Sequence, residues 1–261
     1  MATTASNIGD HLRRWRATRG TSQLELASEA GTTPRYVSFV ETGRAQPSRQ
    51  MVLRLARALD VPLRERNDLL LAAGFAPVYS VEPLSSPTLA RVDRAIDAML
   101  AGHEPFPAVV MNRQWDLQRA NEGAVLLFTR LFAPHDLPAA PNILRTVIEP
   151  GPVRSRIPNW DDVVPALLDR ARREAVCGVL DPATAALVDE LQARDDVASI
   201  AAQAEPAAPV VDLQFELDGE VLSFLSVIST IGTPVDVTAQ EIRVEAFFPS
   251  DEATRAAWPE R

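Results

Sequence analysis

Apolar residues recur at helical spacing through the first quarter of the chain. Ile8, Leu12 and Trp15 lie three or four residues apart, so they share one face of a helix. The same periodicity, together with capping signals, predicts four further helices that begin near Gln23, Pro34, Ser48 and Pro62. We therefore expect an all-α domain of five helices over residues 1–76.

The second helix of this domain opens with a capping box. The Ser22 hydroxyl can accept from a first-turn amide while Glu25 accepts from the amide of the cap residue. Gly31 ends the helix where a positive φ is needed. The apolar stripe that faces the core is predicted to consist of Leu24, Leu26 and Ala27.

The third helix starts with an exposed polar and cationic turn. Thr33 can cap it and Pro34 occupies its first position, where a missing amide costs nothing. Val37 and Val40 face inward, which turns Pro34, Arg35, Ser38 and Phe39 outward and leaves Tyr36 at the margin. Such a helix start fits the major groove of B-DNA, and an arginine fork at Arg35 matches the acceptors of guanine. An ordinary helical hairpin with a solvated arginine has the same spacing.

The segment resembles the helix-turn-helix of Xre/Cro-type repressors. The resemblance rests on SQ-x-ELA, a following glycine and V-S-x-V-E-T-G. It implies that Gln23, Thr33, Pro34, Arg35 and Ser38 face DNA, Gln23 by holding a phosphate, and that Glu41 and Gly43 close the motif. The DNA-binding residues predicted for this domain are Gln23, Thr33, Pro34, Arg35, Tyr36, Ser38, Phe39, Arg44 and Arg49.

The pattern changes after a proline-rich linker over residues 77–87, and residues 88–261 form a second domain. A first amphipathic helix is followed by two short strands around an Asn-Arg-Gln turn. Asp218-Gly219 joins two later strands as a hairpin. The predicted helices cover residues 122–132, 160–176 and 182–203, and the later strands cover 210–217, 221–231 and 241–248. Five antiparallel strands interrupted by helices indicate an α+β fold.

Charge is divided unevenly between the two domains. Residues 1–82 carry 11 arginines and 8 acidic residues, a net charge of +3, whereas residues 83–261 carry 15 arginines and 27 acidic residues, a net charge of −12. Electrostatic attraction to phosphate is screened within about 8 to 10 Å, so the basic domain can bind DNA although the whole chain has a net charge of −9.

Composition excludes several kinds of chemistry. The chain has no lysine, which excludes P-loop and Schiff-base lysines, and its single cysteine, Cys177, excludes an internal disulfide. The three histidines lack metal-ligand spacing, and we find no catalytic motif. No apolar run is long enough to cross a membrane. We therefore expect a cytoplasmic protein that is not an enzyme and needs no cofactor or metal.

A second resemblance covers nearly the whole chain. The runs ALDVPLRERNDLLLAAGFAPVY, AVVMNRQWDLQRANEGA, NILRTVIEPG and VLSFLSVISTIGTPVDVTAQEIRVEAFFPSD are similar to the MmyB-like transcription regulators. The resemblance implies a PAS-like ligand-binding domain in the C-terminal part, with a fatty acid or another long apolar molecule as ligand. We expect a homodimer that binds a two-fold double-stranded DNA operator.

An apolar ligand requires an apolar pocket with few polar anchors. The candidate lining residues are Val110, Trp115, Leu117, Leu127, Phe128, Phe215, Phe224 and Phe247, and the candidate anchors are Arg113, Arg119, Asn121 and Arg145. The same apolar residues could form an ordinary core. An alternative function is a protein-interaction module, in which the acidic C-terminal domain binds a protein partner and the first domain tethers it to DNA.

Overall fold

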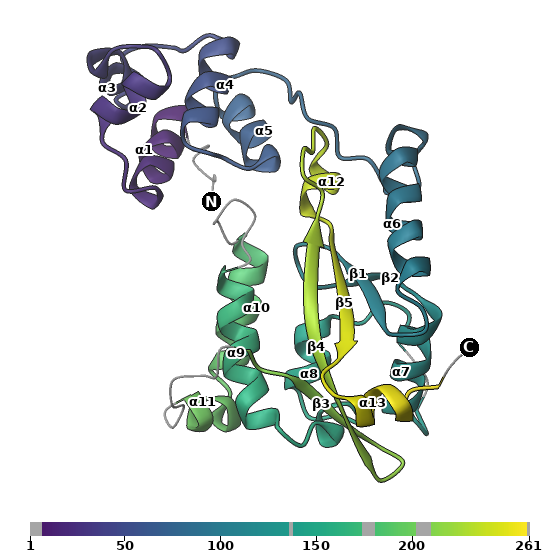
Figure 1. The fold of residues 1–261 in the computed structure, drawn as a ribbon. Coiled ribbons are helices and arrows are strands. Elements are labelled where there is room, and N and C mark those ends of the chain that lie inside the picture. Colours follow the sequence, from purple (N-terminus) through teal and green to yellow (C-terminus); the bar gives the residue numbers. More distant parts are fainter. Residues whose placement is uncertain (1–6, 136–137, 174–180, 202–209, 260–261) are drawn as a thin grey trace. The chain divides into compact units, whose positions relative to one another are not determined.

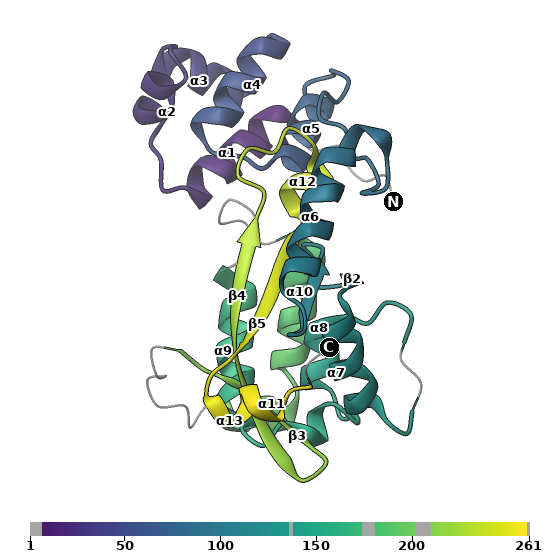
Figure 2. The same cartoon turned by 45° about the vertical axis from the view of Figure 1, so that its right-hand side comes forward.

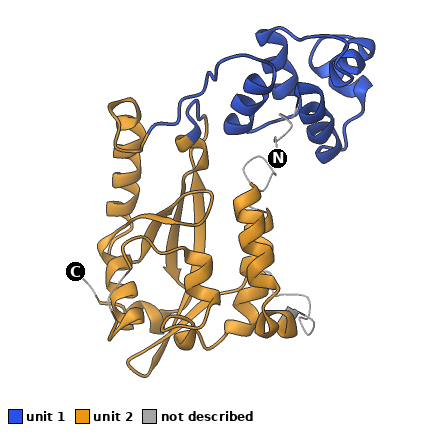
Figure 3. Cartoon of the chain, turned by 180° about the vertical axis from the view of Figure 1, so that it is seen from behind, with its two compact units in different colours: residues 1–82, 234–237 blue, residues 83–233, 238–261 orange. Residues whose placement is uncertain are grey.

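The chain forms two compact units (Figure 3). The computed structural model describes residues 7–135, 138–173, 181–201 and 210–259. Unit 1 comprises residues 1–82 together with residues 234–237, and unit 2 comprises residues 83–233 and 238–261. The chain first passes between the units inside the segment predicted as a linker. The inclusion of residues 234–237, which we call the return segment, in unit 1 was not predicted.

Unit 1 consists of the five predicted helices (Figure 1). They are α1 (Ile8–Thr18), α2 (Gln23–Glu29), α3 (Pro34–Glu41), α4 (Arg49–Ala58) and α5 (Leu63–Ala72). Their shared core is fully buried and includes Leu12, Leu26, Val37, Val40, Val52, Leu55 and Leu70. The prediction of an all-α, five-helix domain is confirmed.

The predicted local signals around α2 and α3 are present, with one correction. The Ser22–Glu25 capping box is complete, Gly31 has a φ of 60°, and the Thr33 hydroxyl accepts from the Tyr36 amide. Leu24, however, was wrongly placed in the buried stripe, since its side chain is 67% exposed. Leu24 is exposed because it is rotated about 200° from Leu26 around the helix. Gln23 takes the partly buried position in that turn.

Unit 2 is built on a five-stranded antiparallel sheet, as predicted (Figure 2). The strands are β1 (Ala108–Met111), β2 (Leu117–Ala120), β3 (Leu213–Leu217), β4 (Glu220–Thr230) and β5 (Arg243–Pro249), in the order β2-β1-β5-β4-β3. The Asp218-Gly219 hairpin joins β3 to β4 with both residues at positive φ. Strand β5 lies between β1 and β4. Its successive side chains point to opposite faces of the sheet, as in any strand.

Helices cover both faces of this sheet (Figures 1 and 2). On one face, α6 (Ala90–Gly102) packs against a small cluster that includes Ile96, Val110 and Val244. The larger core lies on the other face, between the sheet and α7 (Glu122–Phe132), α8 (Ile143–Ile148), α9 (Trp160–Arg173) and α10 (Pro182–Gln192). The remaining helices are α11 (Asp195–Ala201), α12 (Val237–Glu241) and α13 (Glu252–Ala257).

The sequence-based helix assignments in unit 2 need two corrections. The single helix predicted over residues 182–203 is wrong, because α10 closes at Ala193 and α11 restarts at Asp195. Asp196 lies in the first turn of the new helix and forms an ion pair with Arg154, which holds the pKa of its carboxyl at about 2. Helices α8, α12 and α13 were not predicted, since each is too short to establish a period.

The packing of α7 generates a stability prediction. A Cβ added at Gly123 would meet the backbone carbonyl groups of Pro105 and Phe106 inside van der Waals contact, whereas one added at the exposed Gly102 of α6 would meet nothing. Gly123→Ala should therefore lower the free energy of unfolding by about 1–3 kcal/mol. Thermal unfolding measures the effect, and Gly102→Ala is the matched control, expected to be neutral or stabilising by up to about 1 kcal/mol. Equal stability of the two variants would contradict this packing.

Candidate nucleic-acid interface and ligand cavity

The predicted DNA-binding residues gather around the start of α3. Thr33, Pro34 and Arg35 are exposed, and Tyr36, Ser38 and Phe39 are partly exposed. The Arg35 guanidinium lies over the Phe39 ring, 5.2 Å from its centroid, which restricts the direction of the arginine. Arg44, after α3, and Arg49, at the first position of α4, are also exposed. The structure thus leaves these cationic side chains accessible on one helix start and its flanks.

A buried carboxylate holds α3 in place. Glu41 is 3% exposed and accepts from Arg16 Nε and Nη2 over 2.8 and 3.2 Å. Gln23 Nε2 donates to the same carboxylate over 2.7 Å. The hydrogen bond with Glu41 raises the pKa of Arg16, so its guanidinium stays charged. The Gln23 amide, which we predicted to hold a phosphate, is therefore engaged in joining α2 to α3.

Unit 2 contains a cavity of about 320 Å³ between α9 and the large-core face of the sheet. Its wall is mainly aliphatic. The lining residues are Trp115, Ile143, Val147, Val163, Ala166, Leu167, Asp169, Arg170, Arg173, Val210, Val211, Leu213, Leu225, Ser226, Glu245 and Phe247. An apolar wall with few polar groups is typical of sites for small organic molecules.

The polar side of the cavity is an arginine–glutamate pair. Arg170 Nη1 and Nη2 donate to the two carboxylate oxygens of Glu245 over 2.7 and 2.9 Å. Both side chains are largely buried, and Arg170 also lies 3.5 Å from the Ser226 hydroxyl. This two-pronged geometry fixes the arginine against β4 and β5.

Trp115 lies at the same end of the cavity in an unusual backbone conformation. Its φ is 69°, its side chain is 1% exposed, and the guanidinium groups of Arg170 and Arg243 lie 4.8 and 5.4 Å from its ring centroid. The Trp115 amide donates to Asn112 O, and its carbonyl accepts from the Ile143 amide. The turn between β1 and β2 thus presents a rigidly held indole to the cavity.

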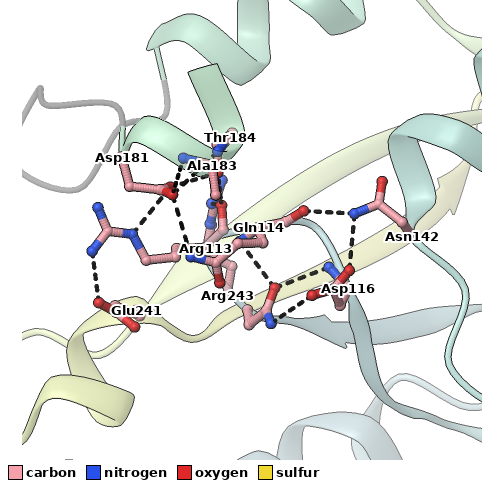
Figure 4. Close-up of polar contacts among 10 residues, drawn as sticks. Arg113, Gln114, Asp116, Asn142, Asp181, Ala183, Thr184, Glu241 and Arg243 are labelled. Carbon is pink, nitrogen blue, oxygen red and sulfur yellow. Dashed lines mark hydrogen bonds and ion pairs between the residues drawn. The ribbon is translucent and has the colours of Figure 1, made fainter. Parts of the chain in front are cut away.

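A buried charge cluster surrounds this turn (Figure 4). Arg113 forms ion pairs with Glu241 over 2.8 Å and with Asp181 over 3.2 Å, while Arg243 donates to the Arg113 carbonyl over 3.1 Å. Asp181 also caps α10 by accepting from Thr184. Burial acts to raise the pKa of Asp181, but the Thr184 hydrogen bonds and the Arg113 charge outweigh it, and the pKa is lowered overall.

Only two of the residues predicted to line a ligand pocket lie on the wall of this cavity. Trp115 and Phe247 line the cavity. Leu117, Leu127, Phe128, Phe215 and Phe224 lie in the large core and do not line it, and Val110 packs on the α6 face of the sheet. The alternation of β1 explains the last case, since Val109 and Met111 take the large-core face.

None of the four predicted polar anchors lines this cavity. Arg113 belongs to the buried charge cluster, and Arg119 pairs with Asp93 and Asp97 on α6. Asn121 caps α7. Arg145 pairs with Glu149 and Glu190, which raise its pKa, and borders a separate pocket of about 250 Å³.

Sequence reasoning missed Arg170, Ser226 and Glu245. A signal for Glu245 was present, since Arg243, Glu245 and Phe247 alternate with Val244 and Ala246 in a strand that is otherwise apolar. Two charged residues at inward positions indicate a buried pair or a site. In the part of the chain that the structure describes, no three His, Cys, Asp or Glu side chains form a metal-binding group. Cys177 lies outside the described residues.

Comparison with known protein families finds two matches in separate parts of the chain. A helix-turn-helix family model matches residues 12–66, and the model of the MmyB-like transcription regulator ligand binding domain matches residues 92–259. Both resemblances inferred from the sequence are thereby confirmed. Within the described ranges, no helix is both long and apolar enough to cross a membrane.

Curated relatives match short stretches of the chain, 61 to 66 residues long. Multiprotein-bridging factor 1 of Saccharomyces cerevisiae is 38% identical over 61 residues, 23% of this chain and 40% of that protein. The protein of the same name in Schizosaccharomyces pombe is 30% identical over 66 residues, 25% of this chain and 45% of its own. A putative multi-protein-binding factor 1 of Yarrowia lipolytica is 32% identical over 62 residues, 24% and 41% of the two chains. The chain spans less than half the length of these relatives.

The lowered pKa of Asp181 gives a pH-dependent prediction. Its folded-state pKa lies below the unfolded value of about 3.9, so its contribution to stability is present above that value and is lost as the pH falls through the folded pKa. Asp181→Asn should lower the free energy of unfolding by about 1–3 kcal/mol at pH 7 and by less near pH 3. Calorimetry at the two pH values measures this. Asp161→Asn, at an exposed helix start, is the control. A deficit that does not change with pH would contradict the assignment.

Proposed function

Because the chain belongs to the family of MmyB-like transcription regulators, we propose that α3 reads a specific DNA operator and that an apolar ligand in the unit 2 cavity controls this binding. A fatty acid is the leading candidate for the ligand. The family match shows that the chain is a DNA-binding transcription regulator with a ligand-binding domain.

The DNA side of the proposal rests on the exposed start of α3. Arg35 is accessible and is positioned by Phe39, so its fork can meet the guanine acceptors in the major groove. Arg44 and Arg49 are exposed on either side of the α3–α4 connection and suit phosphate contacts. Glu41 supports the arrangement by fixing α1, α2 and α3 to one another.

The ligand side rests on the cavity. Its volume of about 320 Å³ falls at the lower end of the range of small-molecule sites, and most of its wall is aliphatic. A cavity of this kind supports a ligand-binding unit over the alternative of a protein-interaction module, which would need only an exposed apolar surface. A chain of methylene groups is the ligand part that such a wall accommodates.

The proposed control of DNA binding rests on the contacts that the return segment makes with residues 80 and 82. Asp236 is buried and accepts from the Ser80 hydroxyl over 2.8 Å and from the Glu82 amide over 3.2 Å. The Val237 amide donates to the Ser80 carbonyl over 2.9 Å. The segment between β4 and β5 is therefore held by the end of unit 1, although it belongs by sequence to the ligand-binding part of the chain.

Helix α5 in turn binds residues 78–79, just before the residues that contact the return segment. Asn67 on α5 accepts from the amides of Val78 and Tyr79 over 3.1 Å and donates to the Tyr79 carbonyl over 2.7 Å. Arg66 on the same helix lies over the Tyr79 ring, 5.8 Å from its centroid. Residues 78–82 thus continue the folded unit after α5.

The chain leads from the return segment directly to the cavity. Helix α12 begins at Val237 and ends at Glu241, which pairs with Arg113, two residues before Trp115. Residues on the cavity wall, Ser226 of β4 and Glu245 of β5, lie on the two strands that flank the segment. A ligand that binds two arrangements of this region with different affinity would shift their populations, and with them the DNA affinity.

We further propose that two copies bind together. A two-fold operator with half-sites about 34 Å apart is the common target of helix-turn-helix proteins and requires two heads. The dimer would place two copies of α3 in successive major grooves. Ligand-dependent change at the return segment would then alter the spacing or direction of the two heads.

Arg35 provides the test of the DNA-binding proposal. Arg35→Ala should weaken binding to an operator obtained by in vitro selection by about 1–3 kcal/mol, with relaxed preference at one base pair. Fluorescence anisotropy with labelled duplexes measures both effects. Arg57→Ala removes the same charge from an exposed position near the end of α4 and should change the affinity little. Equal losses in the two variants would show that Arg35 contributes charge alone.

Asp236 provides the test of the control mechanism. Asp236→Ala removes the two contacts with residues 80 and 82 and should reduce the effect of ligand on operator affinity toward a factor of 1. Val235→Ala, at an 81% exposed neighbour, is the matched control and should retain the full effect. Operator titrations with and without methyl decanoate measure this factor. If Asp236→Ala folds and retains the full effect, the return segment does not transmit the signal.

A further inference from the structure

Trp115 lines the cavity, and its indole N–H is a buried donor without a hydrogen-bond partner among the described residues. The other two tryptophans of unit 2 are satisfied, since Trp160 Nε1 donates to the Val147 carbonyl over 3.0 Å and Trp258 Nε1 donates to the Pro105 carbonyl over 2.8 Å. Buried donors are almost always paired in folded proteins, so an unpaired one beside a cavity indicates a missing acceptor.

The structure holds this donor in a costly position. A bulky residue at a φ of 69° is uncommon, and hydrogen bonds to Asn112 and from Ile143 fix the backbone of Trp115 on both sides. Two guanidinium groups lie over its ring, from Arg170 and Arg243. The side chain therefore has little freedom to find an acceptor elsewhere, which leaves a molecule bound in the cavity, water or ligand, to supply one.

The charges around the cavity disfavour an anionic ligand. Arg170 and Arg173 line it, but so do Asp169 and Glu245, so the charges of the lining residues that the structure describes cancel. The fork of Arg170 is filled by Glu245, which is 5% exposed on its side chain. A ligand carboxylate that took the place of Glu245 would leave that buried charge without its ion-pair partner, which is strongly unfavourable.

From these observations we infer that the ligand presents an uncharged hydrogen-bond acceptor to Trp115 Nε1, with its apolar chain in the aliphatic part of the cavity. The acceptor is a carbonyl group of an ester, an amide, a ketone or a protonated acid. A ligand of the fatty-acid type would thus bind as an ester or as the neutral acid, not as the carboxylate. This inference rests on the proposed ligand-binding function and specifies the chemistry of the same cavity.

Two probes of equal chain length test the inference, methyl decanoate and sodium decanoate. At pH 7, calorimetric titration of the full chain should show tighter binding of the ester, by about tenfold or more. Trp115→Phe keeps a ring and removes the N–H, so it should weaken ester binding by about three- to tenfold, the usual effect of one hydrogen bond. Trp258→Phe is the matched control and should leave the ester affinity unchanged, since Trp258 does not line the cavity.

The indole N–H resonances provide a second readout that needs no stable variant. In a sample with ¹⁵N-labelled tryptophan, methyl decanoate should shift the Trp115 N–H signal downfield, as expected for a new hydrogen bond. The Trp258 signal should stay in place. If the ester binds but neither Trp115→Phe nor the resonance responds, or if decanoate binds more tightly than the ester, the inference is overturned and the ligand-binding function stands. If neither probe binds, the inference and the proposal of a fatty-acid-type ligand both fall.

Discussion

Arg113 carries a positive charge that unit 2 buries almost completely, and the need to neutralise it determines where several distant segments lie. Asp181 at the start of α10 and Glu241 at the end of α12 supply the carboxylates, while Arg243 of β5 binds the Arg113 carbonyl. Removing one partner from such a cluster leaves an uncompensated buried charge, so the segments are tied to one another. The turn that holds Trp115 against the cavity belongs to the same cluster. Trp115 and α12 are therefore linked through the Arg113–Glu241 ion pair.

Unit 1 uses the same kind of constraint for a different purpose. Glu41 is buried, and the side chains that satisfy it come from α1 and α2, so α3 has a fixed direction relative to both. The reading surface needs this rigidity because a side chain reads a base edge only when its backbone is already in position. Each unit thus buries a glutamate that pairs with an arginine, Glu41 in unit 1 and Glu241 in unit 2. The first positions α3 for the proposed DNA binding, and the second lies beside the turn that carries Trp115.

Short-range features of the fold could be predicted from the sequence because their causes are local. The Ser22–Glu25 capping box, Thr33 before Pro34 and the Asp218-Gly219 turn each depend on residues a few positions apart, and the structure contains all of them. The five helices and five strands follow from periodicity in the same way. Where the cause is a contact between distant residues, prediction failed or was silent. The Gln23 amide, for example, is engaged with Glu41, 18 residues later.

The candidate site was predicted less well for the same reason. Sequence spacing selects aromatic residues near the sheet, but it does not say which face a strand turns toward the helices, and Val110 lies on the α6 face. The pair of Arg170 and Glu245 joins positions 75 residues apart, and the capture of the return segment joins positions more than 150 apart. Such pairings are results of the tertiary fold and leave little trace in local patterns. Trp115 was selected as an apolar lining residue, whereas its unpaired N–H became visible only with the surrounding contacts in place.

We propose that ligand binding in the cavity and DNA binding at α3 are thermodynamically coupled. The most direct measurement is a linkage experiment on the intact chain, in which operator affinity is titrated with and without saturating methyl decanoate and ester affinity is titrated with and without operator. Coupling between two binding sites is reciprocal, so the two factors should be equal and differ clearly from 1. Tight binding of both the ester and the operator, with both factors equal to 1 within error, would contradict it.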